Sequence, residues 1–354
     1  MAARATRSAS RKARATEAVA TGPLGALSHD ELGVVFDGLA DPLQPVVAVA
    51  LSSTCLGLRT PLRAALEVLQ EQYTKAKTLC SKLYTPFNLS WDDPEMYSFE
   101  MLRGKEELFL NDQTIDTGDM ATLGMLLARW LPMLEEFYPP CTGDADMQAM
   151  CEALGQGAAP SLIMLDIGNF QQAGAEALVA ALRRGALPSL EHIGLSCDDG
   201  TPGDQCVAAL VAPSRKLKSM ELSGFKIGDE GLASLRKMPA LETLYLRSCE
   251  IGDEGVAALV ADLGKDEFKE VKFFGLRENK KITKVGSDML VAALNAGAMP
   301  KLEMLSLGAE CYETVKAALR AGPRRSLRIR GFGFVAPAGY PDSDDVLSED
   351  DDAF

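Results

Sequence analysis

A strand-like pattern of apolar residues recurs along most of this chain. In LYLRSCEIGDEGVAALVADL (244–263), alternating apolar residues lead into a polar turn marked by glycine, and apolar residues at helical spacing follow. The pattern, apolar at its first, fourth and sixth positions, starts at Leu134, Leu162, Leu190, Leu217, Leu241, Phe268 and Leu302, with partial matches at 107–110 and 326–330. A unit of this size cannot bury its apolar face alone, so we expect the units to stack into a solenoid.

This period, with its L-x-x-L-x-L strand and full helix, resembles the leucine-rich repeat of the ribonuclease-inhibitor type over about residues 105–330. The resemblance implies an α/β fold, a curved parallel sheet with helices on its convex side. We expect the glycines near the helix starts, Gly174, Gly231 and Gly255, to allow a sharp loop. We interpret the longest unit as carrying a basic loop insertion at 277–286.

The ninth position of this repeat type is usually Asn or Cys, which bonds the backbone of neighbouring turns. Counted from the starting residues above, the position holds Thr142, Phe170, Asp198, Phe225, Cys249, Leu276 and Glu310. Only Cys249 conforms, so we expect a weak ladder and turns held together by packing.

Strand geometry predicts the surface of the solenoid that could bind a partner. The fourth and sixth positions point inward, so the fifth and seventh point outward onto the concave face. The partner-binding residues predicted there are Tyr138, Asp166, Glu221, Tyr245, Arg247, Lys272, Phe274, Arg328 and Arg330. Because the acidic residues precede the basic ones, we expect the later turns to bind an acidic or phosphorylated segment. The alternative is that exposed strand positions merely favour bulky and charged residues.

Residues 27–60 precede the repeats and predict a small helical hairpin interrupted by Pro42 and Pro45. The segment resembles an F-box, the module that docks on the Skp adaptor of cullin-based ubiquitin ligases, although Ser28 replaces the usual proline. The resemblance implies an adaptor-binding stripe of apolar residues, which are Leu27, Leu32, Val35, Phe36 and Leu39. The alternative is that the hairpin only caps the apolar end of the solenoid.

These patterns divide the chain into five parts. They are a disordered basic N-terminus (1–26), the F-box-like hairpin (27–60), a helical linker and cap (61–104), the repeat solenoid (105–335) and a disordered acidic tail (336–354). The arginine-rich start is compatible with a nuclear signal and with an organelle transit peptide, and sequence alone separates these two poorly.

Composition and motifs exclude several classes of function. The formal net charge of −14 would repel a phosphate backbone, so we expect no nucleic-acid partner. The chain has no apolar run long enough for a membrane helix, and its scattered cysteines without CxxC pairs favour reduced thiols in the cytoplasm or nucleus. It has no nucleotide-binding, hydrolase or metalloprotease motif and only two histidines, so we expect no catalytic residue, metal or cofactor.

The sequence therefore predicts a non-enzymatic interaction protein, an F-box-like substrate receptor that binds its target through the concave repeat face. Two alternatives stay open: a stand-alone repeat module that binds or inhibits another protein, and a GTPase-activating regulator. The last rests on fold analogy alone.

Overall fold

The computed structural model describes residues 27–53, 58, 60–83, 97–110, 114–140, 143–211, 216–263 and 267–331. The predicted N-terminus (1–26) and acidic tail (336–354) lie outside these residues, as does the end of the predicted solenoid. The chain divides into two compact units, Met1–Gly104 and Lys105–Phe354, which we call the helical unit and the repeat unit. Within the described residues, no helix is both long enough and apolar enough to cross a membrane.

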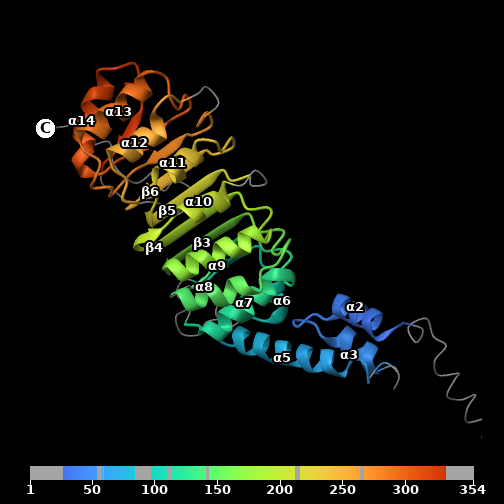
Figure 1. Cartoon of the computed structure of the whole chain (residues 1–354). Coiled ribbons are helices and arrows are strands. Elements are labelled where there is room, and N and C mark those ends of the chain that lie inside the picture. The colour runs from blue at the N-terminus through green and yellow to red at the C-terminus, as the bar shows by residue number, and fades with distance from the viewer. Residues whose placement is uncertain are drawn as a thin grey trace, which may run out of the picture. The chain divides into compact units, whose positions relative to one another are not determined.

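The described helices of the helical unit are α2 (His29–Leu39), α3 (Val46–Ser53), α5 (Arg63–Cys80) and α6 (Phe99–Arg103) (Figure 1). Helix α2 begins with a capping box, in which Ser28 Oγ accepts from the Glu31 amide at 3.2 Å and Glu31 accepts from the Ser28 amide at 2.7 Å. One core cluster of the unit consists of Leu32, Phe36, Ala48, Leu58, Leu62 and Leu69. The side chain of Arg103 pairs with Asp41, which links α6 to the turn after α2.

Burial in this core corrects the predicted adaptor-binding stripe. Leu32 and Phe36 are 3% and 1% exposed, so neither side chain is available to a partner on the surface. The 3.6-residue period that suggested a binding face is the period by which α2 packs onto its own unit. Leu27 and Val35 are half-buried, and Leu39 is exposed.

The repeat unit alternates strands and helices along its whole length. Its strands are β1 (Glu107–Phe109), β2 (Glu136–Tyr138), β3 (Met164–Phe170), β4 (His192–Pro202), β5 (Ser219–Lys226), β6 (Thr243–Arg247), β7 (Phe273–Gly275), β8 (Met304–Ser306) and β9 (Arg328–Arg330). Its helices are α7 (Thr117–Arg129), α8 (Asp144–Glu152), α9 (Gln172–Arg183), α10 (Asp204–Leu210), α11 (Asp229–Leu235), α12 (Asp253–Val260), α13 (Lys284–Asn295) and α14 (Ala309–Arg320).

The nine strands form one parallel sheet in the order of the sequence, β1 to β9. Figure 1 shows the helices of the repeat unit on one face of this sheet. We call the other face, which carries none of the described helices of the repeat unit, the open face; it corresponds to the predicted concave face. The predicted α/β solenoid with a parallel sheet is thus confirmed.

The pairing of β6 with β7 shows that the repeat pattern of one turn starts at Val271 and not, as predicted, at Phe268. Leu244 pairs with Phe274 and Tyr245 with Gly275, so the apolar positions of this turn are Val271, Phe274 and Leu276 rather than Phe268, Val271 and Phe273. Phe274 is fully buried, and its predicted place on the binding face is wrong. The adjacent phenylalanines at 273 and 274 make both frames look apolar in sequence.

The corrected frame brings Asn279 to the ninth position, where the repeat type favours Asn. Its Oδ1 accepts from the amides of Cys249 at 2.9 Å and Ile251 at 3.1 Å, and its Nδ2 donates to the Leu246 carbonyl at 2.6 Å. Cys249 Sγ lies 3.3 Å from the Leu222 carbonyl of the preceding turn. Residues 277–286 therefore continue the repeat, which corrects the predicted loop insertion, and the predicted weak ladder does not hold at this turn.

The glycines near the helix starts have a different cause from the predicted one. Asp253, the first residue of α12, accepts from the Thr283 amide at 2.8 Å and the Gly286 amide at 2.9 Å at the start of α13. A Cβ at Gly286 would overlap this carboxylate. The same arrangement joins Asp144 to the start of α9 and Asp204 to the start of α11. At Gly174, Gly231 and Gly286 the close approach of a carboxylate, rather than a sharp turn, requires glycine, whereas a Cβ at Gly255 would meet the side chains of Ile251 and Leu232.

Candidate binding surface on the open face of the sheet

Three rows of side chains cross the open face, because alternate residues of each strand point to it. The fifth position of successive repeats holds Phe109, Tyr138, Asp166, Gly194, Glu221, Tyr245, Gly275, Ser306 and Arg330. Two residues further along, the seventh position holds Pro140, Gly168, Ser196, Ser223, Arg247, Arg277 and Gly308. The third position, two residues before the fifth, carries His192 and Ser219 on neighbouring strands.

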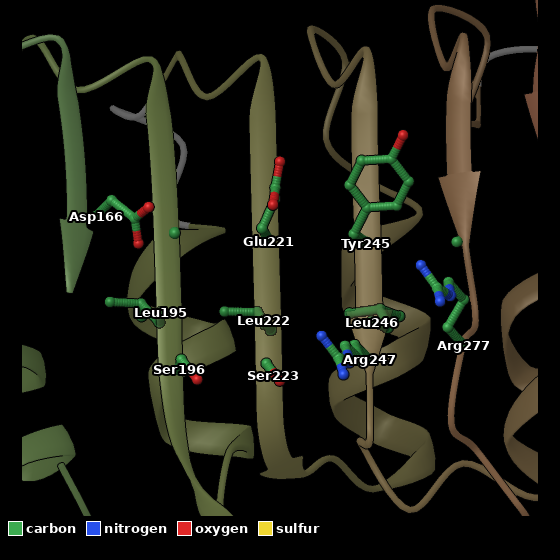
Figure 2. Close-up of a pocket in the computed structure, with 12 residues that line it drawn as sticks. Asp166, Leu195, Ser196, Glu221, Leu222, Ser223, Tyr245, Leu246, Arg247 and Arg277 are labelled. Atoms are coloured by element: carbon green, nitrogen blue, oxygen red, sulfur yellow. The ribbon is translucent and has the colours of Figure 1, made fainter. Parts of the chain in front are cut away.

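A hollow of about 240 Å³ lies in the middle of the open face, over β3 to β7. Its walls are formed by Asp166, Glu221, Tyr245, Arg247 and Arg277 (Figure 2). The floor is open because the residues between these walls are small, namely Gly194, Ser196, Ser223 and Gly275. The sheet thus carries a recess where glycine and serine lie beside the larger side chains of the fifth and seventh positions.

Two glycines let the wall side chains lean across the sheet. A Cβ at Gly194 would lie 2.7 Å from Asp166 Oδ1, so the carboxylate of Asp166 rests over β4 and points toward Glu221 (Figure 2). A Cβ at Gly275 would overlap the ring of Tyr245, which rests over β7 in the same way. Any side chain at these two positions would close part of the hollow.

The acidic wall is electrostatically strained. Burial, and then the nearby charge of Asp166, raise the pKa of Glu221 to about 7. Burial also raises the pKa of Asp166. On the neighbouring strand, burial lowers the pKa of His192, so this imidazole supplies no strong countercharge.

The basic wall consists of Arg247 on β6 and Arg277, which follows the end of β7. Arg247 donates to Glu278 Oε1 at 2.6 Å, and both side chains of this pair are nearly half exposed. Arg277 lies beside it on the following turn (Figure 2). The sequence prediction missed Arg277, because the wrong frame placed Lys272 and Phe274 on the face instead of Gly275 and Arg277. The signal that could have found it is the sequence VKFFGLREN, whose asparagine fixes the frame.

The other predicted residues lie apart from the hollow. Tyr138 stacks on Phe109 with ring centroids 4.4 Å apart, and its hydroxyl donates to Glu136 Oε2 at 3.1 Å. Lys272 precedes β7 and pairs with Glu242 at 2.6 Å. Arg328 and Arg330 are exposed on β9, two strands beyond β7 in the sheet. Of the nine predicted partner-binding residues, Asp166, Glu221, Tyr245 and Arg247 come together around the hollow.

The described residues contain no group of three or more His, Cys, Asp or Glu side chains placed to hold a metal ion. The cysteines whose surroundings are described are free thiols, and burial raises the pKa of Cys80 to about 11 and that of Cys206 to about 12. Thiols with raised pKa values are poor nucleophiles at neutral pH.

Comparison with known proteins supports the repeat fold. A family model described as leucine-rich repeat matches residues 237–260, the turn that contains Tyr245 and Arg247. No curated protein matches the sequence. A solved structure, from the crystal structure of the Rad7 and Elc1 complex in yeast, is 15% identical with a TM-score of 0.42, covering 90% of this chain and 83% of that chain. So distant a likeness says nothing about partners or activity.

Proposed function

We propose that this chain is a non-enzymatic interaction adaptor. Its repeat unit, of the ribonuclease-inhibitor type, binds a target protein through the open face, and its helical unit docks on a Skp-type adaptor of a cullin-type ubiquitin ligase. The chain is then a substrate receptor that brings the target to the ligase. The full twelve-residue helices α9 and α13 between strands support this repeat type.

The hollow on the open face is the observation that carries the proposed target site. Tyrosine and arginine are the residue types that anchor protein interfaces, and here Tyr245, Arg247 and Arg277 line one recess on a rigid parallel sheet. Because guanidinium groups bind carboxylates and phosphates in pairs of hydrogen bonds, the basic wall suits an acidic or phosphorylated segment of the target.

The helical unit carries apolar side chains that its own core does not use. Val34 on α2 is 74% exposed, and Val46 and Val47 on α3 are 70% and 53% exposed. Exposed apolar residues on adjacent elements of a small unit are typical of a protein-binding surface. Together with the F-box-like sequence, they support docking through α2 and α3, although through different residues from the buried Leu32 and Phe36.

The experiment is a titration calorimetry measurement between the full chain and a purified Skp-type adaptor. We expect a one-to-one complex, and we expect Val46→Asp combined with Val47→Asp to weaken it at least about tenfold, since a buried unpaired charge costs more than 1.4 kcal/mol. Val285→Asp, at a 55% exposed site on α13 of the repeat unit, is the matched control and should bind like wild type.

Two results would refute the docking proposal. One is the absence of a complex under conditions in which an established F-box protein binds the same adaptor. The other is equal affinity of the wild type and the valine double variant, with both folded by circular dichroism. Either result would leave the repeat unit as a stand-alone binding module.

A further inference from the structure

Among the described residues, no cationic side chain pairs with the acidic wall of the hollow. Across the described chain, the carboxylates of Asp166 and Glu221 form no ion pair or hydrogen bond. The two groups nonetheless face each other over the glycine of β4. A half-buried carboxylate pair without a cation is unfavourable, and the raised pKa of Glu221 reflects that cost. An ammonium or guanidinium group of a bound partner would remove this cost by pairing with the two carboxylates.

The basic wall can bind an anion at the same time. Arg247 is engaged with Glu278, but this ion pair is exposed and so contributes little, and a guanidinium has five N–H donors. Arg277, two residues after the end of β7, also lines the hollow. The hollow therefore has an acidic wall over β3 to β5 and a basic wall over β6 and β7, with Tyr245 between them (Figure 2).

The distance between the two walls sets the distance between the two charged groups of a ligand that contacts both. Glu221 and Arg247 are one strand apart and two residues apart along the strand, which places their Cα atoms about 8 Å from each other. An extended peptide advances about 3.3 Å per residue, so two to four residues separate side chains that reach both walls. A recess of about 240 Å³ has room for a few side chains rather than for a folded surface.

We infer that the hollow binds an extended peptide segment of the target in which a lysine or arginine lies two to four residues from an aspartate, glutamate or phosphorylated residue. This inference rests on the proposed function of the open face and narrows it to a segment with both charges. A segment with acidic residues alone would meet Asp166 and Glu221 as like charges, so the acidic wall discriminates against it.

The experiment uses a displayed library of random twelve-residue peptides selected on the immobilised full chain. The same library is selected in parallel on three variants of the chain. They are Asp166→Asn with Glu221→Gln (the acidic-wall variant), Arg247→Gln with Arg277→Gln (the basic-wall variant), and all four substitutions together (the fourfold variant). These substitutions keep side-chain size nearly constant on the acidic wall and keep polar groups on the basic wall. The affinities of the enriched peptides are then measured by calorimetry as synthetic peptides.

We expect wild-type selection to enrich peptides with a basic and an acidic residue at the stated spacing. Loss of a charged hydrogen-bonding partner should weaken such a peptide about tenfold to a hundredfold on either double variant. Selection on the acidic-wall variant should retain the acidic residue and lose the basic one, and the basic-wall variant should do the reverse.

The outcomes separate this inference from the proposed function. Enrichment of acidic peptides without a basic residue, with affinity that depends on the arginines only, would overturn the inference and leave the open face as the target site. Equal affinity of the best peptides for wild type and the acidic-wall variant would overturn it as well. Identical enrichment on wild type and the fourfold variant would overturn both.

Discussion

Replacing Asn279 with alanine tests the corrected frame of the repeat. The side chain is 5% exposed and bonds two amides and the Leu246 carbonyl, and it also donates to the Arg277 carbonyl at 3.2 Å. Under the sequence interpretation of 277–286 as a surface loop, the substitution would be almost neutral. Under the observed register it removes the link between two turns.

The magnitude follows from the groups that lose their partner. The amides of Cys249 and Ile251 belong to residues that are 0% and 1% exposed, and Leu246 is fully buried. A buried polar group left without a partner costs about 1–3 kcal/mol. Water entering the vacated space can satisfy part of this set, so we expect a net loss of about 3 kcal/mol. For a unit of this size, that corresponds to a fall in Tm of roughly 6–12 °C.

Urea denaturation followed by circular dichroism measures this loss. Lys280→Ala is the matched control, because it changes the next residue, which is exposed, and should alter the free energy of unfolding by less than about 0.5 kcal/mol. If Asn279→Ala and Lys280→Ala changed the free energy of unfolding equally, the ladder bonding of Asn279 would be refuted.

Three further outcomes follow from burial and close contacts. Burial raises the pKa of Glu221 from 4.5 to about 7, so the folded chain binds more protons between these pH values and loses stability as pH rises. Glu221→Gln should therefore exceed wild type in free energy of unfolding by about 1–3 kcal/mol at pH 8 and match it at pH 4; a pH-independent difference would contradict this. Gly286→Ala should cost about 1–3 kcal/mol in urea denaturation, because its Cβ would overlap Asp253, whereas Gly155→Ala has no atom within 4 Å and should not destabilise. Phe36→Asp should abolish the helical circular dichroism of the helical unit, since this 1% exposed side chain is in its core; retention of a native signal would refute that placement.

The fold was predictable because its signal is carried by many residues at once. Period, strand pattern and helix pattern agree from turn to turn, and one misframed unit does not change the architecture. The same redundancy does not extend to individual side chains. Shifting the frame around Phe273 and Phe274 moved the predicted face from Gly275 and Arg277 to Lys272 and Phe274, because side chains alternate along a strand.

Two other features depended on contacts that sequence does not display. The spacing of apolar residues along α2 predicts that one face of the helix is buried, but it does not say whether another protein or the helix's own unit covers that face. Spacing alone therefore could not tell whether Leu32 and Phe36 bind a partner or belong to the core. The hollow depends on the side chain of Asp166 leaning over Gly194. These two residues are paired on neighbouring strands but lie 28 positions apart in the sequence. The charges of the hollow were visible in the sequence, but its shape was not.

The proposal that the helical unit binds the ligase and the open face binds the target is tested most directly by hydrogen–deuterium exchange. The exchange of the full chain is measured with and without saturating Skp-type adaptor. If α2 and α3 dock on the adaptor, the amides of His29–Leu39 and Val46–Ser53 should be protected. The strands that line the hollow, β3 to β7, should exchange as in the free chain. Protection confined to those strands, or no protection anywhere at saturating adaptor, would contradict a receptor that uses the helical unit for the ligase and the open face for the target.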